Sequence, residues 1–249
     1  MRKNAPSNKL LVIFPFWEGD KSDTMNLARF IADMQPGPGI SPTADFLFVS
    51  RFDSSQDQAT INYVSRKFKV YTYTSKRRGT GWPNGCSDLF FGCMEYFFRM
   101  MEANRIPHYK AAFIMESDVI PLALDALQRI SNIWDKLGSV CVAGAWLPNG
   151  ITPGVGHING GACLLSGNID FLRWLATRAH ANGAGWDYVV APEFKQRGWA
   201  DVPQIRSYWQ QQVTEEIFLR EKSVGTLFLH GSKGNIGVKL CRKHLLGQP

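Results

Sequence analysis

The sequence lacks the features that mark several large classes of protein. Its five cysteines are odd in number, widely spaced and without a Cys-x-x-Cys pair, which argues against a disulfide framework and against a zinc site. No apolar run approaches the roughly 18 residues that a transmembrane helix needs, and the run behind residues 1–6 is too short for a signal peptide. The sequence also has no internal repeat and no low-complexity linker. We therefore expect one soluble, cytoplasmic domain without a membrane anchor and with reduced cysteines.

The composition is that of a chain that can build a hydrophobic core. Apolar residues make up 45% of the 249 positions and charged residues 20%, which excludes a disordered chain. Lysine and arginine number 28 against 21 acidic residues, which gives a net charge of +7. This excess of positive charge favours anionic partners such as nucleotides, nucleic acids or membrane surfaces.

Apolar runs alternate with helical patterns in the first third of the chain. Strands are expected at Lys9–Pro15, Ala44–Ser50 and Lys69–Tyr73, with helices over 22–34 and 57–67 between them. This order predicts an α/β fold with a single Rossmann-like domain, whose central, mostly parallel sheet is flanked by helices. Further strands are expected over 110–119, 139–144, 162–166 and 226–230, and further helices over 87–101, 124–137, 171–180 and 183–197.

Two carboxylates follow a strand that should be buried. Residues 111–115 are continuously apolar, as in a parallel strand covered on both faces, and Glu116-Ser117-Asp118 comes directly after them. Ligands of open α/β sheets bind just beyond the carboxyl ends of the strands. Two acids separated by one residue at that edge suit a hard cation that also holds a phosphate. The alternative is a pair of solvated acids at a strand end.

A glycine-rich, polar run covers residues 148–161 and ends in His157-Ile158-Asn159-Gly160-Gly161. We expect a loop here, in which glycine lets the backbone approach a ligand closely. A dinucleotide fingerprint is a poor alternative because Gly154 and Gly156 do not lie between a strand and the start of a helix. An ordinary surface loop is the other alternative.

Two further motifs lie in the second half of the chain. Gly185-Trp186-Asp187 opens an expected helix, where Asp187 could also serve as a capping residue. The strand that ends near Leu229 runs into His230-Gly231-Ser232-Lys233-Gly234. A single histidine at a strand end is commonly structural, but here glycine and lysine follow it closely.

In this order, the four motifs resemble those of the GT-A class of nucleotide-sugar glycosyltransferases, and the resemblance extends over nearly the whole chain. The triplet Glu116–Asp118 resembles the class's DXD motif with glutamate in its first position. The segment Gly185–Asp187 resembles its xED motif with Trp186 in place of the middle acid. The resemblance implies one GT-A domain over residues 1–249, with a nucleotide-sugar-binding half over about 1–122 and an acceptor-binding half over about 123–249. It also implies metal-dependent transfer of a hexose from a nucleoside-diphosphate sugar, with a UDP-sugar favoured, to an acceptor hydroxyl.

The resemblance also assigns roles to individual residues. Mn²⁺ or Mg²⁺ would be bound by Asp118, Glu116 and His230, and Asp187 would take a proton from the acceptor, so that the reaction inverts the anomeric centre. Donor-binding residues would be Pro15, Phe16 and Trp17 near the base, Arg51 and Arg78 near ribose or phosphate, and Ser117 and Lys233 near the diphosphate. A loop for the transferred sugar and the acceptor would include His157, Asn159, Gly160, Gly161 and Trp186.

The acceptor is expected to be cytosolic because the chain has no anchor. Basic clusters at 66–69, 76–78 and 239–244 could follow the phosphate backbone of double-stranded DNA. A hydroxymethylated pyrimidine base would then be the acceptor, as in phage DNA modification, and a phage-encoded enzyme would act in the host cytoplasm. A protein, glycan or lipid-linked acceptor, a non-catalytic nucleotide-sugar-binding module and a nucleotidyltransferase are the alternatives.

Overall fold

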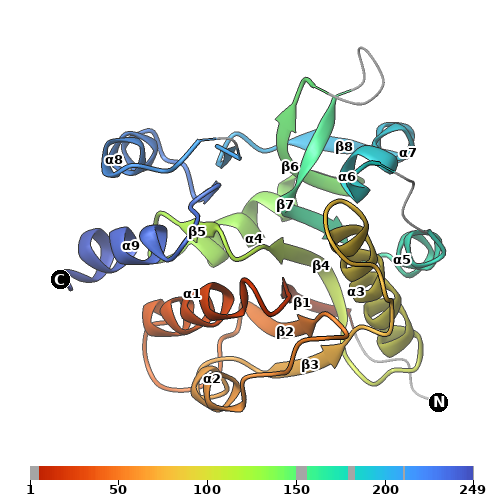
Figure 1. Ribbon diagram of the computed structural model, residues 1–249, viewed down its shortest axis with the longest axis horizontal. Coiled ribbons are helices and arrows are strands. Elements are labelled where there is room, and N and C mark those ends of the chain that lie inside the picture. The colour runs from red at the N-terminus through yellow and green to blue at the C-terminus, as the bar shows by residue number, and fades with distance from the viewer. Residues whose placement is uncertain (1–5, 150–155, 179–182, 210, 249) are drawn as a thin grey trace.

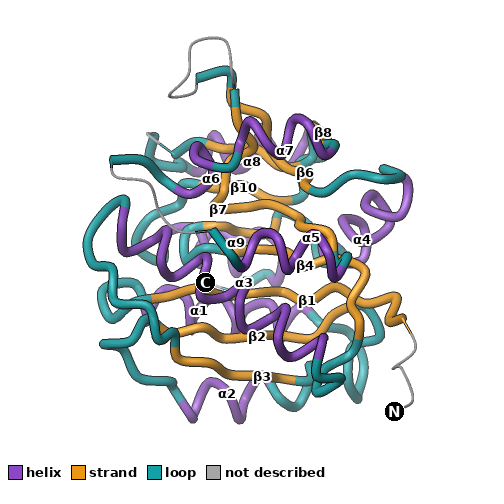
Figure 2. The backbone as a smooth tube through the Cα atoms, turned by 90° about the vertical axis from the view of Figure 1, so that its right-hand side faces the viewer, coloured by secondary structure: helices purple, strands orange, loops and turns teal. Residues whose placement is uncertain are grey.

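A seven-stranded sheet lies between two layers of helices in the computed structural model, which describes residues 6–149, 156–178, 183–209 and 211–248 (Figure 1). In spatial order the strands are β3 (Val70–Thr74), β2 (Ala44–Ser50), β1 (Pro6–Phe16), β4 (His108–Met115), β7 (His157–Ser166), β6 (Val142–Leu147) and β8 (Trp199–Asp201). Figure 2 shows most of these strands stacked in this order. All neighbouring pairs are parallel except those that β7 makes with β4 and β6. The mostly parallel sheet predicted from the sequence is therefore confirmed.

A small second sheet lies next to the carboxyl end of β4. It consists of β5 (Val119–Pro121), β10 (Phe228–His230) and β9 (Ile205–Ser207). β10 runs antiparallel to β5 and parallel to β9. This sheet brings the end of the chain beside the turn that follows β4.

The nine helices of the described residues cover both faces of the large sheet. They are α1 (Lys21–Met34), α2 (Gln58–Val64), α3 (Asn84–Glu102), α4 (Ala126–Lys136), α5 (Ile169–Ala176), α6 (Trp186–Val189), α7 (Ala191–Arg197), α8 (Glu215–Ser223) and α9 (Ile236–Leu246). α1, α2, α4, α8 and α9 contribute to the core on one face, and α3, α5, α6 and α7 to the core on the other. Successive side chains of β1 alternate between them: Leu10, Val12 and Phe14 face the first core, whereas Leu11 and Ile13 face the second. None of the described helices combines the length and the apolar character that a membrane crossing requires.

Several expected elements differ from those of the structure. The loop expected at His157–Gly161 is wrong, because these residues form the first half of β7, where His157 and Ile158 pair with β6 and the carbonyl of Gly161 accepts the N–H of Glu116 just after β4. The helix expected over 183–197 is two helices, and Pro192 stands in the first turn of the second. Proline has no N–H to donate, so it begins α7 instead of continuing α6. The strand expected over 110–119 ends at Met115, and β5 follows after a turn.

Other differences are additions or shorter elements. α8, β8 and β9 were not expected from the sequence. The helix expected over 171–180 covers Ile169–Ala176, and residues 179–182 lie outside the described residues. The same holds for residues 150–155 of the glycine-rich run. The basic residues at 239–244 belong to α9.

Replacing Phe46 by alanine should strongly destabilise the fold. Its side chain is fully buried, stacks on Phe68 with 3.9 Å between the ring centroids, and meets Phe14 edge-on at 5.0 Å. A buried Phe→Ala change leaves a cavity, and we expect the free energy of unfolding to fall by about 3–5 kcal/mol in urea denaturation. The control is Leu219→Ala on the exposed side of α8, which should change it by less than about 0.5 kcal/mol. Equal effects of the two changes would contradict this description of the core.

Candidate active site

A cavity of about 480 Å³ opens at the carboxyl ends of β1 and β4. Parallel strands end together at this edge, and the antiparallel β7 begins there, so three strands bring their terminal residues to one place. Pro15 lines the cavity from β1, Glu116 follows β4, and His157 and Gly160 come from the start of β7. The first turns of α3 and the short helix α6 form the opposite wall. This is the edge at which open α/β sheets bind their ligands.

Main-chain hydrogen bonds shape the turn that carries the two acids. The N–H of Glu116 donates to the carbonyl of Gly161 at 3.0 Å, and the N–H of Val119 donates to the carbonyl of Glu116 at 3.0 Å. The carbonyl of Asp118 accepts from the N–H groups of Gly231 and Ser232, which follow β10. The turn is thus tied both to β7 and to the end of β10.

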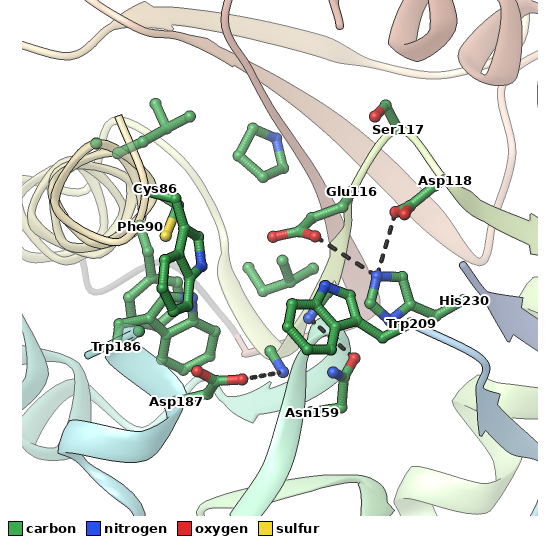
Figure 3. A pocket seen from close by; sticks show the side chains of 18 of the residues that line it. Cys86, Phe90, Glu116, Ser117, Asp118, Asn159, Trp186, Asp187, Trp209 and His230 are labelled. Carbon is green, nitrogen blue, oxygen red and sulfur yellow. Dashed lines mark hydrogen bonds and ion pairs between the residues drawn. The ribbon is translucent and has the colours of Figure 1, made fainter. Parts of the chain in front are cut away.

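Glu116, Asp118 and His230 point toward one another at this turn (Figure 3). The Nε2 atom of His230 lies 3.2 Å from Oδ1 of Asp118 and 3.6 Å from Oε2 of Glu116. One ligand atom from each of the three residues lies within 4.8 Å of the other two. The Nζ atom of Lys233 forms an ion pair with the other carboxylate oxygen of Asp118. The structure therefore brings together the three residues predicted to bind a metal.

The three side chains fit a divalent cation. Both carboxylate oxygens of Asp118 and the Nε2 atom of His230 are buried, and their contacts among the described residues are the ion pairs with one another, with Glu116 and with Lys233. A cation would coordinate the two carboxylates and the imidazole at once. The backbone also leaves room here, because a Cβ atom on Gly161 would lie 2.5 Å from Nε2 of His230 and 2.9 Å from Oε2 of Glu116. Two carboxylates and one imidazole are suitable ligands for a first-row divalent metal.

For both Asp118 and His230, burial and the charges of neighbouring groups act on the pKa in opposite directions. Burial alone would raise the pKa of Asp118, but the cationic partners His230 and Lys233 outweigh it and hold that pKa well below its usual range. Burial likewise opposes protonation of His230, but Asp118 and Glu116 raise its pKa to about 9. Without a metal, Asp118 is thus an anion paired with two cations.

Asp187 lies on the other side of the cavity, in the first turn of α6. Its Oδ2 atom accepts the N–H of Gly160 at 3.0 Å, and its Oδ1 atom accepts the N–H of Tyr188 at 3.1 Å. Nε2 of the buried His157 lies 3.7 Å from Oδ2, and the Nδ1 atom of that ring is 2.8 Å from the carbonyl oxygen of Asn149. Burial raises the pKa of Asp187, although the neighbouring His157 works against the shift.

Trp186 forms part of the wall beside Asp187. Its ring stacks on Phe90 of α3 with 3.4 Å between the centroids and 3° between the planes. A Cβ atom on Gly160 would lie 2.5 Å from the Trp186 ring, so glycine is what allows the indole to pack against β7. Asn159, whose Oδ1 atom accepts the N–H of Gly161 at 3.2 Å, also lines the cavity.

Most of the predicted donor-binding residues line the cavity, but two do not. Pro15, Trp17, Arg51, Ser117 and Lys233 are among the lining residues. Arg51 lies over the Trp17 ring at 5.1 Å and forms a bidentate pair with Asp53. Phe16, in contrast, is fully buried in the core, and Arg78 lies over the ring of Phe52 at 4.8 Å, outside the lining.

The structure adds cavity residues that the sequence motifs did not indicate. Asp20 precedes α1, accepts the N–H of Trp17 at 2.8 Å, and has its pKa raised to about 6 by burial and, to a smaller extent, by Glu116 and Asp118. Cys86 lines the α3 side, and Trp209 lies beside Asn159 and His230 in Figure 3 with 47% of its surface exposed. Trp82, with 69% of its surface exposed, lines the rim as well, and its place in the long basic loop after β3 already makes it a weaker donor-binding candidate from the sequence. A tryptophan in a loop was the one signal that could have indicated Trp209.

Solved structures that resemble this chain are glycosyltransferases. The glycosyltransferase GlyE of Streptococcus pneumoniae TIGR4 matches with a TM-score of 0.53 and 12% identity, over 93% of this chain and 59% of its own length. The bifunctional glycosyltransferase WbbM matches with a TM-score of 0.55 and 10% identity, over 94% of this chain and 47% of its own. Mouse xyloside xylosyltransferase 1 matches with a TM-score of 0.54 and 12% identity, over 90% and 98%. The chain thus spans about half of the first two proteins and nearly all of the third.

These comparisons concern the fold. No protein-family model matches the chain, and no curated protein matches it in sequence. At 10 to 12% identity, the structural likeness shows that the chain has the GT-A fold predicted from its motifs.

Replacing Gly161 by alanine should disrupt metal binding without unfolding the protein. The added methyl group would displace the imidazole of His230 or the carboxylate of Glu116, and we expect the affinity for Mn²⁺ to fall about 10- to 100-fold. Electron paramagnetic resonance of free Mn²⁺ measures this without any activity assay. Ser117→Ala, in the same turn but outside the ligand cluster, is the control and should bind Mn²⁺ like the wild type. Unchanged Mn²⁺ binding in the Gly161→Ala protein would argue against a metal at this cluster.

Proposed function

We propose that the protein is a metal-dependent glycosyltransferase that moves a sugar from a nucleoside-diphosphate sugar to an acceptor hydroxyl. The observation that carries this proposal is the cluster of Glu116, Asp118 and His230, with Lys233 beside it, at the ligand-binding edge of a GT-A sheet. The proposal agrees with the three structural neighbours described above, which are all glycosyltransferases.

The cluster and Lys233 would serve the donor's diphosphate. Because the ligand set includes an imidazole nitrogen, we favour Mn²⁺ over Mg²⁺, which prefers oxygen ligands. When bound, the metal would neutralise negative charge on the leaving nucleoside diphosphate. Lys233 now pairs with Asp118, and its largely exposed ammonium group can turn to the same diphosphate. Trp17 and Arg51 lie near enough to bind the base and ribose, for which we favour a uridine nucleotide.

Asp187 would act on the acceptor. Two backbone N–H groups hold its carboxylate in place, and its raised pKa makes it a stronger base than an exposed aspartate. A base in this position would take the proton of the acceptor hydroxyl while the hydroxyl oxygen attacks the sugar, and the anomeric centre would then be inverted. The stacked Trp186 and Phe90 would exclude water from the transferred sugar.

Some of the basic residues that suggested a DNA acceptor already pair with neighbouring residues. In α9, Arg242 pairs with Asp33 at 2.9 Å, and Lys243 and His244 both pair with Glu215. Arg77 donates to the carbonyls of Ala176 and Arg178 in addition to its acidic neighbours. The paired residues of α9 and Arg77 are therefore less available to a DNA backbone. An acceptor screen should include a hydroxymethylated DNA base beside protein, glycan and lipid-linked acceptors.

Asp118→Ala should abolish both donor binding and donor hydrolysis. In the wild type, a UDP-sugar with Mn²⁺ should raise the melting temperature, because a ligand that binds only the native state stabilises it. The variant should lose this shift, whereas the control Asp125→Ala, an exposed acid at the start of α4, should keep it. The released product separates the alternatives: a nucleoside diphosphate identifies sugar transfer or hydrolysis, and pyrophosphate would identify a nucleotidyltransferase. No shift with any nucleotide sugar would refute the proposed function.

Asp187→Asn should remove transfer while leaving donor binding intact. Loss of a general base lowers kcat by about 10²- to 10⁴-fold, and the wild-type rate should rise with pH through a pKa above the usual range of an aspartate. Asp201→Asn is the matched control, because Asp201 also accepts a backbone N–H, from Trp146 at 3.0 Å, but lies outside the cavity. Wild-type turnover in the Asp187→Asn protein would exclude Asp187 as the base, and with it the argument for inversion.

A further inference from the structure

A second cavity, of about 410 Å³, lies on the α3 side of the edge strand β3. Tyr73 at the end of β3 and Tyr96 on α3 form its aromatic wall, and their rings stack with 4.3 Å between the centroids. The loop after β3 and the segment after α3 complete the lining. Its volume lies within the range of small-molecule sites, about 300–1,000 Å³.

The charge of this cavity is strongly positive. Lys76, Arg77, Arg99 and Arg105 line it together with a single acid, Glu95. Four like charges around one cavity repel one another, and one carboxylate leaves a formal excess of three positive charges. An anion in the cavity would relieve this repulsion.

Two of the four cationic side chains already form ion pairs with Glu95. Glu95 pairs with Arg99 at 2.7 Å and with Arg77 at 3.7 Å, and Arg77 is fixed further by the carbonyls of Ala176 and Arg178. The side chains of Lys76 and Arg105 have no hydrogen bond or ion pair within the described part of the chain. Two cations of the lining, Lys76 and Arg105, are therefore uncompensated within the described part of the chain.

The second cavity is separate from the site described above. Cys86 and Phe90 line the first cavity from the beginning of α3, whereas Tyr96 and Arg99 line the second from its later turns. Ten residues of helix separate Cys86 from Tyr96, a distance of about 15 Å at 1.5 Å per residue. A phosphate bound beside Lys233 could not reach Lys76 or Arg105 at the same time.

We propose that this basic cavity is a second ligand site and that its ligand carries a phosphate group. A phosphate monoester has about −1.5 to −2 charges at neutral pH, which matches the two uncompensated cations better than a carboxylate does. Guanidinium groups also bind phosphate oxygens in pairs of hydrogen bonds. The ligand is either free phosphate or a phosphate ester whose carrier lies against the two tyrosines. This site does not depend on the proposed transferase activity.

Isothermal titration calorimetry with inorganic phosphate tests the proposal. All proteins carry Lys233→Ala and are measured in EDTA. The first cavity then has neither Lys233 nor a metal with which to bind phosphate. The double variant Lys76→Ala/Arg105→Ala should raise the Kd about tenfold or more. The control Lys195→Ala/Lys239→Ala removes the same formal charge from exposed positions elsewhere and should leave the Kd within about twofold. Thermal unfolding of each variant verifies that it is folded.

A third variant predicts a change of the opposite sign. Glu95→Gln removes the one negative charge of the cavity and frees Arg99, so the Kd for phosphate should fall several-fold. Titration with ribose 5-phosphate then distinguishes the two sources. If it binds more tightly than inorganic phosphate, and Tyr96→Ala removes that difference, the ligand is an ester. If the two bind equally, the ligand is free phosphate. No measurable binding, or equal losses in the two double variants, would overturn the proposal.

Discussion

The candidate site depends on the main-chain hydrogen bonds that join the turn after β4 to the end of β10. The carbonyl of Asp118 accepts two N–H groups from residues 231 and 232, and His230 stands opposite Val119 in the antiparallel pair of β10 and β5. These bonds place a histidine from the end of the chain beside a carboxylate from its middle. Since they are backbone bonds that directly continue the pairing of β5 with β10, they set the geometry of the cluster before any ligand arrives, which is the preorganisation that a binding site requires.

Stability alone does not account for this cluster. Asp118 and His230 are 2% and 1% exposed, and taking such charged groups out of water costs free energy that their mutual attraction repays only in part. Apolar residues of similar size would stabilise the same place at least as well. The charges also stand at the edge of a cavity, where the atoms of Asp118 and His230 contact one another and Lys233 as ion pairs. A bound ligand would explain why Asp118 and His230 are buried here, and a cation that holds a diphosphate would be such a ligand.

The sequence allowed much of the fold to be predicted, because the central strands are covered on both faces and therefore appear as continuous apolar runs. The acids of Glu116-Ser117-Asp118 could be placed for the same reason: they directly follow such a run. The first half of β7 could not be predicted, since Asn159-Gly160-Gly161 has the composition of a loop. Its strand conformation comes from pairing with β6 and from the hydrogen bond between Gly161 and the backbone of Glu116. Its glycines are explained by Trp186 and His230, which pack against it from distant segments. Asp20 belongs to no motif, and only the folded chain brings it near Glu116 and Asp118.

The same strand also fixes the relation between the two halves of the site. The N–H of Gly160 holds the carboxylate of Asp187, and the carbonyl of the next residue, Gly161, holds the backbone of Glu116. Two adjacent residues of β7 thus set the distance between the acid that would receive a proton and the cluster that would hold the leaving group. Sugar transfer needs both functions at a constant separation, because the acceptor oxygen must approach as the diphosphate departs. A pair of glycines in a sheet strand meets this need: the strand supplies rigidity, and the absence of side chains lets Trp186 and His230 pack directly against it.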